Sequence, residues 1–222
     1  MIRKQGSPAL HFLDRYVGIP AAVILGRARR KRDLPAEIRT LGLLRTAAIG
    51  DTVLLSGPIA DLRAAFPEAF MVLFAGPGNV EMARLVDGID CVVEVPNANP
   101  AAALRRVRST PVDILLDFGQ WPRFDALLAR LSGGSFTAGF QTPGQHRHYG
   151  YDVAVEHSTE VHEIENFRRL VGALGVPTGH PPRLTAPSPG ASPSQLRGVS
   201  SLGGRTQEAS EAVARRALAR AD

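Results

Sequence analysis

The chain has 222 residues, of which 44% are hydrophobic and 21% are charged. This length suffices for one α/β domain with extensions, but not for two nucleotide-fold domains of ordinary size. The composition excludes global disorder, and the single cysteine, Cys91, excludes an internal disulfide and a cysteine-built zinc site. The formal net charge of +5 comes mainly from basic clusters near the two ends of the chain.

Residues 1–37 form a basic and apolar N-terminal segment, in which an apolar stretch over residues 16–25 precedes five basic residues between Arg27 and Arg32. It lacks the small-residue cleavage site of a secretory signal, and it has about half of the roughly 20 apolar residues that a spanning helix needs. We expect either a solvated, flexible segment or one that lies on the inner leaflet with its arginines on lipid phosphates. Nucleic acid is not an expected partner, because no aromatic residue is interleaved with the basic run.

Residues 38–183 alternate short apolar runs with longer helical patterns, which predicts βα units around a doubly wound, mainly parallel sheet. Strands are expected over residues 40–44, 69–74, 91–95, 112–117 and 152–155. Helices are expected over residues 52–65, 80–86, 101–107, 123–131 and 161–174. Most of the strand patterns are continuously apolar, as in strands that are covered on both faces.

Residues 184–222 form a tail of different character. Its first half, up to residue 204, is rich in Pro, Ser and Gly and has almost no large apolar side chains. This composition is typical of a disordered linker. The stretch 208–221 favours a short helix but has too few large apolar residues to build a core.

The loop after the first predicted strand is the most informative segment, because it runs from an apolar strand through small residues into a helix. In an open α/β sheet, ligands bind outside the carboxyl ends of the strands, so this loop faces the crevice. Gly50 permits a tight turn, and Asp51 is expected at or just before the helix N-terminus. Two roles are open for Asp51: an N-cap for the helix, or a general base that acts on a bound hydroxyl.

Polar residues at the ends of later elements are further candidates. Asp117 and Gln120 follow the fourth predicted strand, where they either bind sugar hydroxyls beside the ring of Trp121 or form a strand-end turn. A second set, His162, Glu165 and Asn166, shares one helical face, which is either ligand-facing or simply polar.

Other motifs do not fit known sites. The stretch 75–81 lacks the third glycine of a dinucleotide-binding fingerprint, and the sequence has no phosphate-binding loop of the Walker type. His146 and His148 have no acidic or third histidine ligand at metal spacing, so we expect a solvated loop over residues 144–150 and no metal site.

Several motifs follow one another along the chain: LLRTAAIGD at 43–51 with Pro58, LRAAFP at 62–67, VDILLD at 112–117 with Gln120, ARLSG at 129–133 with a turn at Gly139 and Phe140, and HEIEN at 162–166 with Leu174 and Gly175. Together they resemble glycosyltransferase family 9, the ADP-heptose:lipopolysaccharide heptosyltransferases. The resemblance covers about residues 38–180.

The resemblance implies the Rossmann-like, acceptor-binding N-terminal half of a two-domain GT-B-type glycosyltransferase of bacteria. Such an enzyme transfers heptose, or a related sugar, with inversion from a nucleotide-sugar donor to a lipopolysaccharide core or lipid-linked sugar acceptor, without a metal or other cofactor. By this resemblance Asp51 would be the general base, while Arg45 and the 47–50 loop with Ala48 and Gly50 would shape the acceptor site. Two departures stand out: family members often carry Ser-Ser-Leu in this loop, and the donor-binding domain is absent.

The resemblance leaves two main hypotheses for function. The first is a truncated cytoplasmic transferase, inactive as this chain because a helix N-terminus or cation that stabilises the leaving diphosphate is missing. The alternative is a non-catalytic domain that holds the acceptor at the inner membrane surface. A third hypothesis, a nucleotide-sugar-binding regulator, is disfavoured by the lack of a phosphate-binding loop.

Overall fold

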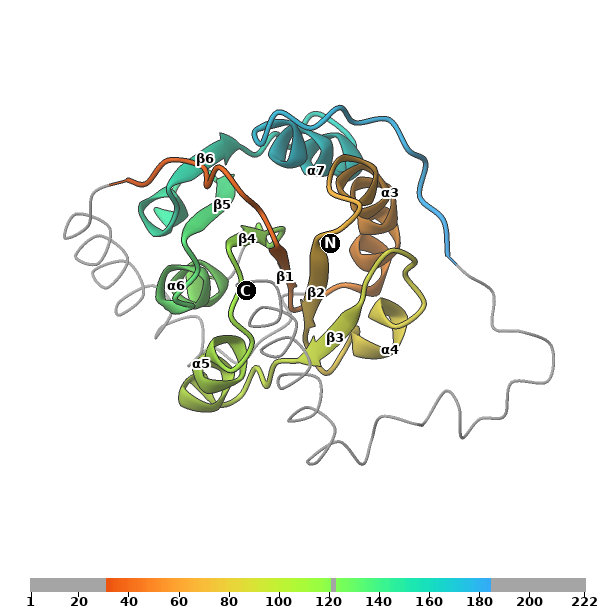
Figure 1. Ribbon diagram of the computed structural model, residues 1–222. Helices are drawn as coiled ribbons and strands as arrows, with labels where there is room; N and C mark the ends of the chain where they lie inside the picture. Colours follow the sequence, from red (N-terminus) through yellow and green to blue (C-terminus); the bar gives the residue numbers. More distant parts are fainter. Residues whose placement is uncertain (1–30, 121–122, 185–222) are drawn as a thin grey trace, which may run out of the picture.

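The computed structural model describes residues 31–120 and 123–184 (Figure 1). They form a six-stranded sheet in which each neighbouring pair is parallel, in the order β3-β2-β1-β4-β5-β6. The strands are β1 (Thr40–Arg45), β2 (Phe70–Ala75), β3 (Cys91–Glu94), β4 (Ile114–Asp117), β5 (Phe136–Gln141) and β6 (Val153–Glu156). The predicted doubly wound α/β class is confirmed.

Helices cover both faces of the sheet (Figure 1). One face carries α3 (Ile49–Ala65), α4 (Val80–Ala83) and α7 (Glu163–Gly172). The other carries α5 (Pro100–Arg108), α6 (Arg123–Leu131) and the short 3-10 helix η1 (Arg147–Gly150). Parallel strands require such crossover connections, and the crossovers place helices above and below the sheet.

The two faces explain why the strand sequences are continuously apolar. Leu43 packs with Leu55 of α3 and Phe167 of α7 in one core, whereas the next residue, Leu44, packs with Val107 of α5 in the other. Successive side chains of a strand point to opposite faces, so a strand with a core on each side is apolar along most of its length.

The sequence pattern does not predict one of the strands. Residues 136–141 lack a clear strand pattern, and Gly139 and Phe140 are expected in a turn, but both lie inside β5, which pairs with β4 and β6. A Cβ at Gly139 would lie 2.4 Å from the ring of Tyr151, so the glycine makes room for that ring against the sheet. A glycine inside a strand commonly marks such a close approach, and it also weakens the local strand pattern.

The sheet reverses its strand order between β1 and β4, which are direct neighbours although β2 and β3 lie between them in sequence. Because all strands are parallel, the loops that follow β1 and β4 leave the same edge of the sheet. The point at which strand order reverses is where open α/β sheets bind ligands. The loop with Asp51 and the turn with Gln120 therefore share the most favourable position for a site.

Two segments outside the regular elements are fastened to the domain. After α7, the chain crosses α3, where the carboxylate of Asp61 accepts hydrogen bonds from the backbone N–H groups of Gly179 and His180, both at 3.0 Å. At the other end, the Arg32 guanidinium pairs with Asp152 at 2.8 Å. In the part of the chain that the structure describes, no helix is long and apolar enough to cross a membrane.

Candidate functional site

Arg45 and Asp51 form the centre of the site at the carboxyl end of β1. Arg45 is the last residue of β1, and its guanidinium forms an ion pair with Asp51 in the first turn of α3. The same guanidinium donates to the backbone carbonyl of Phe118, 2.7 Å away just after β4, and lies 5.9 Å from the ring centroid of Phe167 in α7. A single buried arginine therefore connects β1, β4, α3 and α7.

The Asp51 side chain is 24% exposed, whereas that of Arg45 is 6% exposed. The Oδ2 atom of Asp51 contacts Arg45, and Oδ1 has no hydrogen-bond partner within the described ranges. The carboxylate is thus oriented by one oxygen and keeps the other available at the protein surface. The residues before it, from Ala47 to Gly50, are also exposed, so the loop is open to a ligand.

The expectation that Asp51 caps α3 is wrong. The N-cap is Ala48, whose φ of 68° is unusual for a residue other than glycine, and Asp51 lies within the first helical turn. Helix α3 begins three residues earlier than predicted, because Ala48, rather than Asp51, provides the first carbonyl: its oxygen accepts from the backbone N–H of Thr52 at 3.1 Å. Of the two roles considered for Asp51, the capping role is removed.

Asn79, in the loop after β2, fixes the 46–52 loop through hydrogen bonds of its buried side chain. Its side chain is 1% exposed, and its Nδ2 donates to the carbonyl of Arg45 at 2.9 Å and to the hydroxyl of Thr52 at 2.8 Å. Its Oδ1 accepts from the backbone N–H of Gly76 at 2.9 Å. A Cβ at Gly76 would lie 1.9 Å from the carbonyl oxygen of Thr46, so this position requires glycine. The stretch 75–81, which failed as a nucleotide-binding motif, is a support for the β1 loop.

Asp117 lies beneath the crevice edge rather than on it. Its carboxylate is fully buried, pairs with Arg147 at 2.5 Å, and accepts from the Tyr151 hydroxyl and from the backbone N–H of Gly119. A sugar hydroxyl would reach Asp117 only after this cluster had rearranged. Arg147 is itself fully buried, so the expectation of a solvated loop over residues 144–150 is wrong at this position.

A second buried carboxylate, Asp125 of α6, belongs to the same cluster. Its Oδ2 accepts from the hydroxyl of Thr46 at 2.8 Å, and its Oδ1 has no partner in the described structure. Burial, followed by the charge of Asp117, raises the pKa of Asp125 to about 7. Arg147 and the Thr46 hydroxyl oppose this effect without cancelling it. Asp125 therefore carries a proton over most of the acidic range, immediately beneath the loop that presents Asp51.

The remaining predicted residues lie apart from this centre. Gln120 is half-buried, and its backbone carbonyl accepts from the hydroxyl of Thr142 at 3.0 Å. His162 is exposed and caps α7, with its Nδ1 accepting from the backbone N–H of Ile164 at 3.4 Å. Asn166, expected on the same face as His162, is buried and binds Ser158 and Glu163 instead. The roles expected for Trp121, for residues 1–30 and for residues 185–222 lie outside the described residues.

Sequence reasoning missed Asn79, Asp125 and Arg147 as parts of the site's support. Asn79 left a weak signal, since a polar side chain directly after a buried strand and before a helix commonly binds neighbouring backbone groups. Arg147 left none, because its partner Asp117 is 30 residues away. In residues 31–120 and 123–184, no group of three or more His, Cys, Asp or Glu side chains is arranged to hold a metal ion.

The geometry suits one kind of chemistry. An exposed carboxylate oxygen, oriented by a buried arginine and presented by a loop at the switch point of the sheet, can accept a proton from a ligand hydroxyl. The rigid support from Arg45 and Asn79 would hold it in place while a second reactant approaches.

No protein-family model matches the chain, and no curated protein matches it. Among solved structures, it is similar to E. coli heptosyltransferase WaaC with ADP-2-deoxy-2-fluoro heptose (17% identity, TM-score 0.56, covering 63% of this chain and 50% of that chain). It is also similar to E. coli ADP-heptose lps heptosyltransferase II (14%, 0.54, 67% and 47%). A third similar structure is the glycosyl transferase family 9 from Veillonella parvula DSM 2008 (16%, 0.53, 66% and 43%). The chain thus spans about half the length of these proteins. Over that half, it has a glycosyltransferase family 9-like fold.

Proposed function

We propose that this chain is the acceptor-binding half of an inverting glycosyltransferase. It would take part in transfer of heptose, or a related sugar, from a nucleotide sugar such as ADP-heptose to a lipopolysaccharide core acceptor. The donor would bind to a second nucleotide-fold domain, as expected for a two-domain enzyme of twice this length. The reaction would take place on the cytoplasmic side of the inner membrane, with residues 1–32 as a peripheral contact to the lipid-linked acceptor.

The observation that carries the proposal is the free Oδ1 of Asp51 beside the Arg45 ion pair, within the described residues. In the proposed reaction, Asp51 takes the proton of an acceptor hydroxyl as the hydroxyl oxygen forms a bond to the anomeric carbon of the donor sugar. The bond from that carbon to the diphosphate oxygen breaks, and the nucleoside diphosphate leaves with the electron pair. Attack from the face opposite the leaving group inverts the anomeric configuration.

Other residues would have supporting roles. The exposed backbone of the 47–50 loop, including Ala48 and Gly50, would contact the acceptor, and Arg45 would orient Asp51 rather than touch the sugar. Gln120 and His162 would lie farther along the same edge, where they would contact outlying sugars of an extended acceptor. Asp117 would position the Gly119–Gln120 turn from beneath.

The test separates binding from turnover. Binding of a heptose-free lipopolysaccharide acceptor to the 222-residue protein is measured by calorimetry, and transfer is measured as ADP release from ADP-heptose with a donor-binding domain supplied in trans. We expect Asp51→Asn to bind the acceptor within about threefold of wild type and to lower kcat by about 10²–10⁴-fold. Glu68→Gln, a carboxylate substitution just beyond the opposite end of α3, is the matched control.

A second candidate function follows from the half-length coverage of the similar structures. A domain that only holds the acceptor would bind it and would show no transfer under any donor-domain condition. Acceptor binding that is unaffected by Asp51→Asn, together with transfer that is equally unaffected, would refute the general-base role. Failure of the wild-type protein to bind the acceptor would refute both functions.

A further inference from the structure

The two helical layers of the domain differ in charge. Helix α5 contains three arginines and no acidic residue, and the only acidic residue of α6 is Asp125, which is buried. Across the sheet, α3, α4 and α7 carry acidic and basic residues together: Asp51, Asp61 and Arg63 in α3, Glu81 in α4, and Glu163, Glu165, Arg168 and Arg169 in α7. Helices α5 and α6 therefore present positive charge and no exposed carboxylate of their own.

Apart from Glu94 of β3, which is exposed, the acidic residues near this layer are engaged within the fold. Between residues 100 and 152 they are four aspartates. Asp117 pairs with Arg147, Asp125 accepts from Thr46, Asp113 accepts from Thr40, and Asp152 pairs with Arg32. Their charge is directed into the domain and does not neutralise the outer surface.

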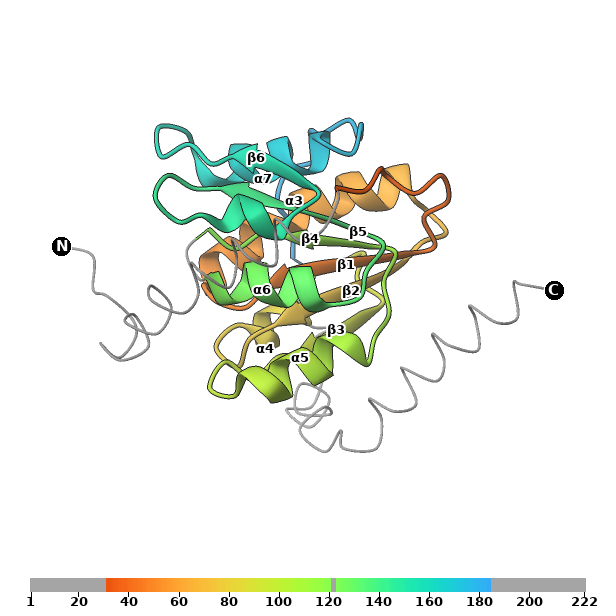
Figure 2. The same cartoon turned by 90° about the vertical axis from the view of Figure 1, so that its left-hand side faces the viewer.

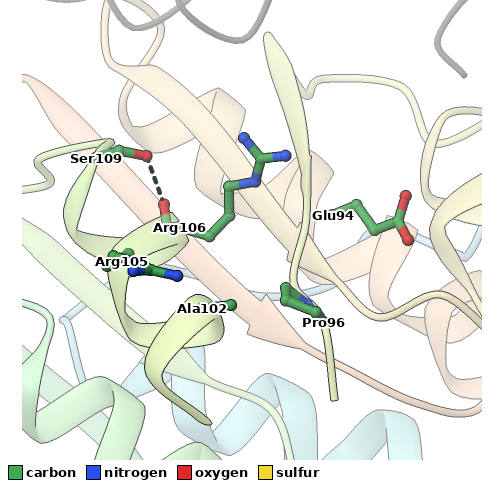
Figure 3. Close-up of a pocket in the computed structure, with 6 residues that line it drawn as sticks. All are labelled: Glu94, Pro96, Ala102, Arg105, Arg106 and Ser109. Carbon is green, nitrogen blue, oxygen red and sulfur yellow. Dashed lines mark hydrogen bonds between the residues drawn. The ribbon is translucent and has the colours of Figure 1, made fainter. Parts of the chain in front are cut away.

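Among the described residues, Arg105 and Arg106 are two cations of this layer that are available to a ligand. Neither takes part in an ion pair among the described residues, and Arg105 is exposed while Arg106 is half-buried. Both line an open depression of about 510 Å³ between α5 and β3. Figure 3 shows that Glu94, which also lines the depression, points its carboxylate away from both guanidinium groups. The depression therefore offers two cationic side chains and room for a phosphate-sized group.

The first described residues of the chain, Lys31 and Arg32, lie beside the same layer. Arg32 is fixed to Asp152 and to the carbonyl of Gly134, just after α6, and the charge of Lys31 acts on His148 of η1. The three arginines at positions 27, 29 and 30 precede Lys31 directly, and an apolar stretch precedes them. In a sequence, a basic run that follows an apolar stretch is typical of segments that contact an anionic membrane.

We propose that the α5–α6 layer, centred on Arg105 and Arg106, docks on an anionic phospholipid surface. In Figure 2, which views the domain from this side, α5 and α6 lie in front of the sheet. Nucleic acid shares the phosphate chemistry, but the described residues of α5 carry no aromatic side chain on which a base could stack. The docking does not depend on the proposed transferase activity, because vesicle binding is measured without any sugar transfer.

The test uses sedimentation of the full chain with vesicles of phosphatidylglycerol and phosphatidylethanolamine, with pure phosphatidylcholine vesicles as the neutral reference. Each basic side chain near an anionic surface contributes about fivefold to partitioning, so Arg105→Ser with Arg106→Ser should weaken binding about twenty- to thirtyfold. The control pair, Arg84→Ser with Arg169→Ser, removes the same charge from the opposite layer and should weaken binding less than about threefold. Raising the salt concentration from about 50 to about 300 mM should weaken wild-type binding and reduce the difference between the two pairs.

Three outcomes would overturn the proposal. The first is equal binding to anionic and neutral vesicles, which would assign any association to the apolar N-terminal stretch alone. The second is an equal loss in both variant pairs, which would indicate net charge rather than a docking face. The third is binding to duplex DNA or RNA that is tighter than binding to the anionic vesicles at the same salt concentration and is lost in Arg105→Ser with Arg106→Ser. Circular dichroism of each variant confirms that it is folded before binding is compared.

Discussion

The buried carboxylate of Asp125 makes the stability of this domain depend on pH in a direction that differs from that of a typical aspartate. Its pKa is raised from 3.8 to about 7 by burial and by the charge of Asp117. In the folded protein it therefore keeps a proton that the unfolded chain has already lost. Stability from this residue is fully present below pH 3.8 and is lost as the pH rises through 7, because the folded state binds more protons over that range.

The magnitude follows from that difference in pKa. One pH unit corresponds to about 1.4 kcal/mol per proton, so a rise from 3.8 to about 7 costs the folded state about 4 kcal/mol at pH values above 7. Part of the cost, about 1.6 kcal/mol, is already present at pH 5. Between pH 5 and pH 8, the free energy of unfolding should therefore fall by about 2.7 kcal/mol because of Asp125 alone.

Asp125→Asn removes this dependence, since an amide is neutral throughout and its oxygen can still accept from Thr46. Urea unfolding of both proteins, followed by far-UV circular dichroism at pH 5, 6, 7 and 8, gives the difference in free energy of unfolding at each pH. Between pH 5 and pH 8, we expect the free energy of unfolding of the variant to rise by about 2–3 kcal/mol relative to that of wild type. Asp87→Asn, at an exposed position, should run parallel to wild type. Parallel curves for Asp125→Asn and wild type would show that Asp125 is ionised in the folded protein at pH 5, and would refute the reasoning.

Three further predictions concern the support of the site. Gly76→Ala places a Cβ 1.9 Å from the carbonyl oxygen of Thr46 and should lower the free energy of unfolding, measured by urea titration, by about 3 kcal/mol or more. The control Gly78→Ala meets no atom within 4 Å and should change it by less than about 0.5 kcal/mol. Similar values for the two variants would contradict the close approach of Gly76 to Thr46. Arg45→Lys keeps the charge but cannot bind Asp51 and the carbonyl of Phe118 at the same time. It should lower the free energy of unfolding by about 1–3 kcal/mol and lower kcat in the transfer assay. An unchanged kcat would mean that the orientation of Asp51 does not depend on Arg45. Asp61→Ala should raise the amide hydrogen exchange rates of Gly179 and His180 at least about tenfold, with unchanged rates counting against the tether across α3.

Local patterns in the sequence are enough for most of the fold. Strands β1 to β4 are short apolar runs that hydrophobicity alone identifies, and helix α6 has the bounds that the sequence predicts, Arg123–Leu131. The sequence does not predict β5 because Gly139 interrupts the strand pattern. A glycine is needed at this position because the ring of Tyr151, 12 residues later in the chain, packs against it. Such a contact is invisible to a pattern that is read along neighbouring residues.

The site divides in the same way. Arg45 and Asp51 are six residues apart on either side of one loop, so the spacing of strand, loop and helix is sufficient to place them together at the crevice. Their orientation depends on Phe118, Phe167 and Asn79, which come from three other loops and helices.

The burial of Asp117 was decided by tertiary structure alone. At a strand end, an aspartate is equally suited to bind a ligand or to pair with a distant arginine, and only the return of the chain through η1 brings Arg147 against it. The sequence by itself determined the helical layers on a mainly parallel sheet and the place of Asp51 in the loop that faces the crevice. Tertiary packing decided which carboxylates are buried and which are open to solvent, because burial and ion pairing depend on neighbours that lie far away along the chain.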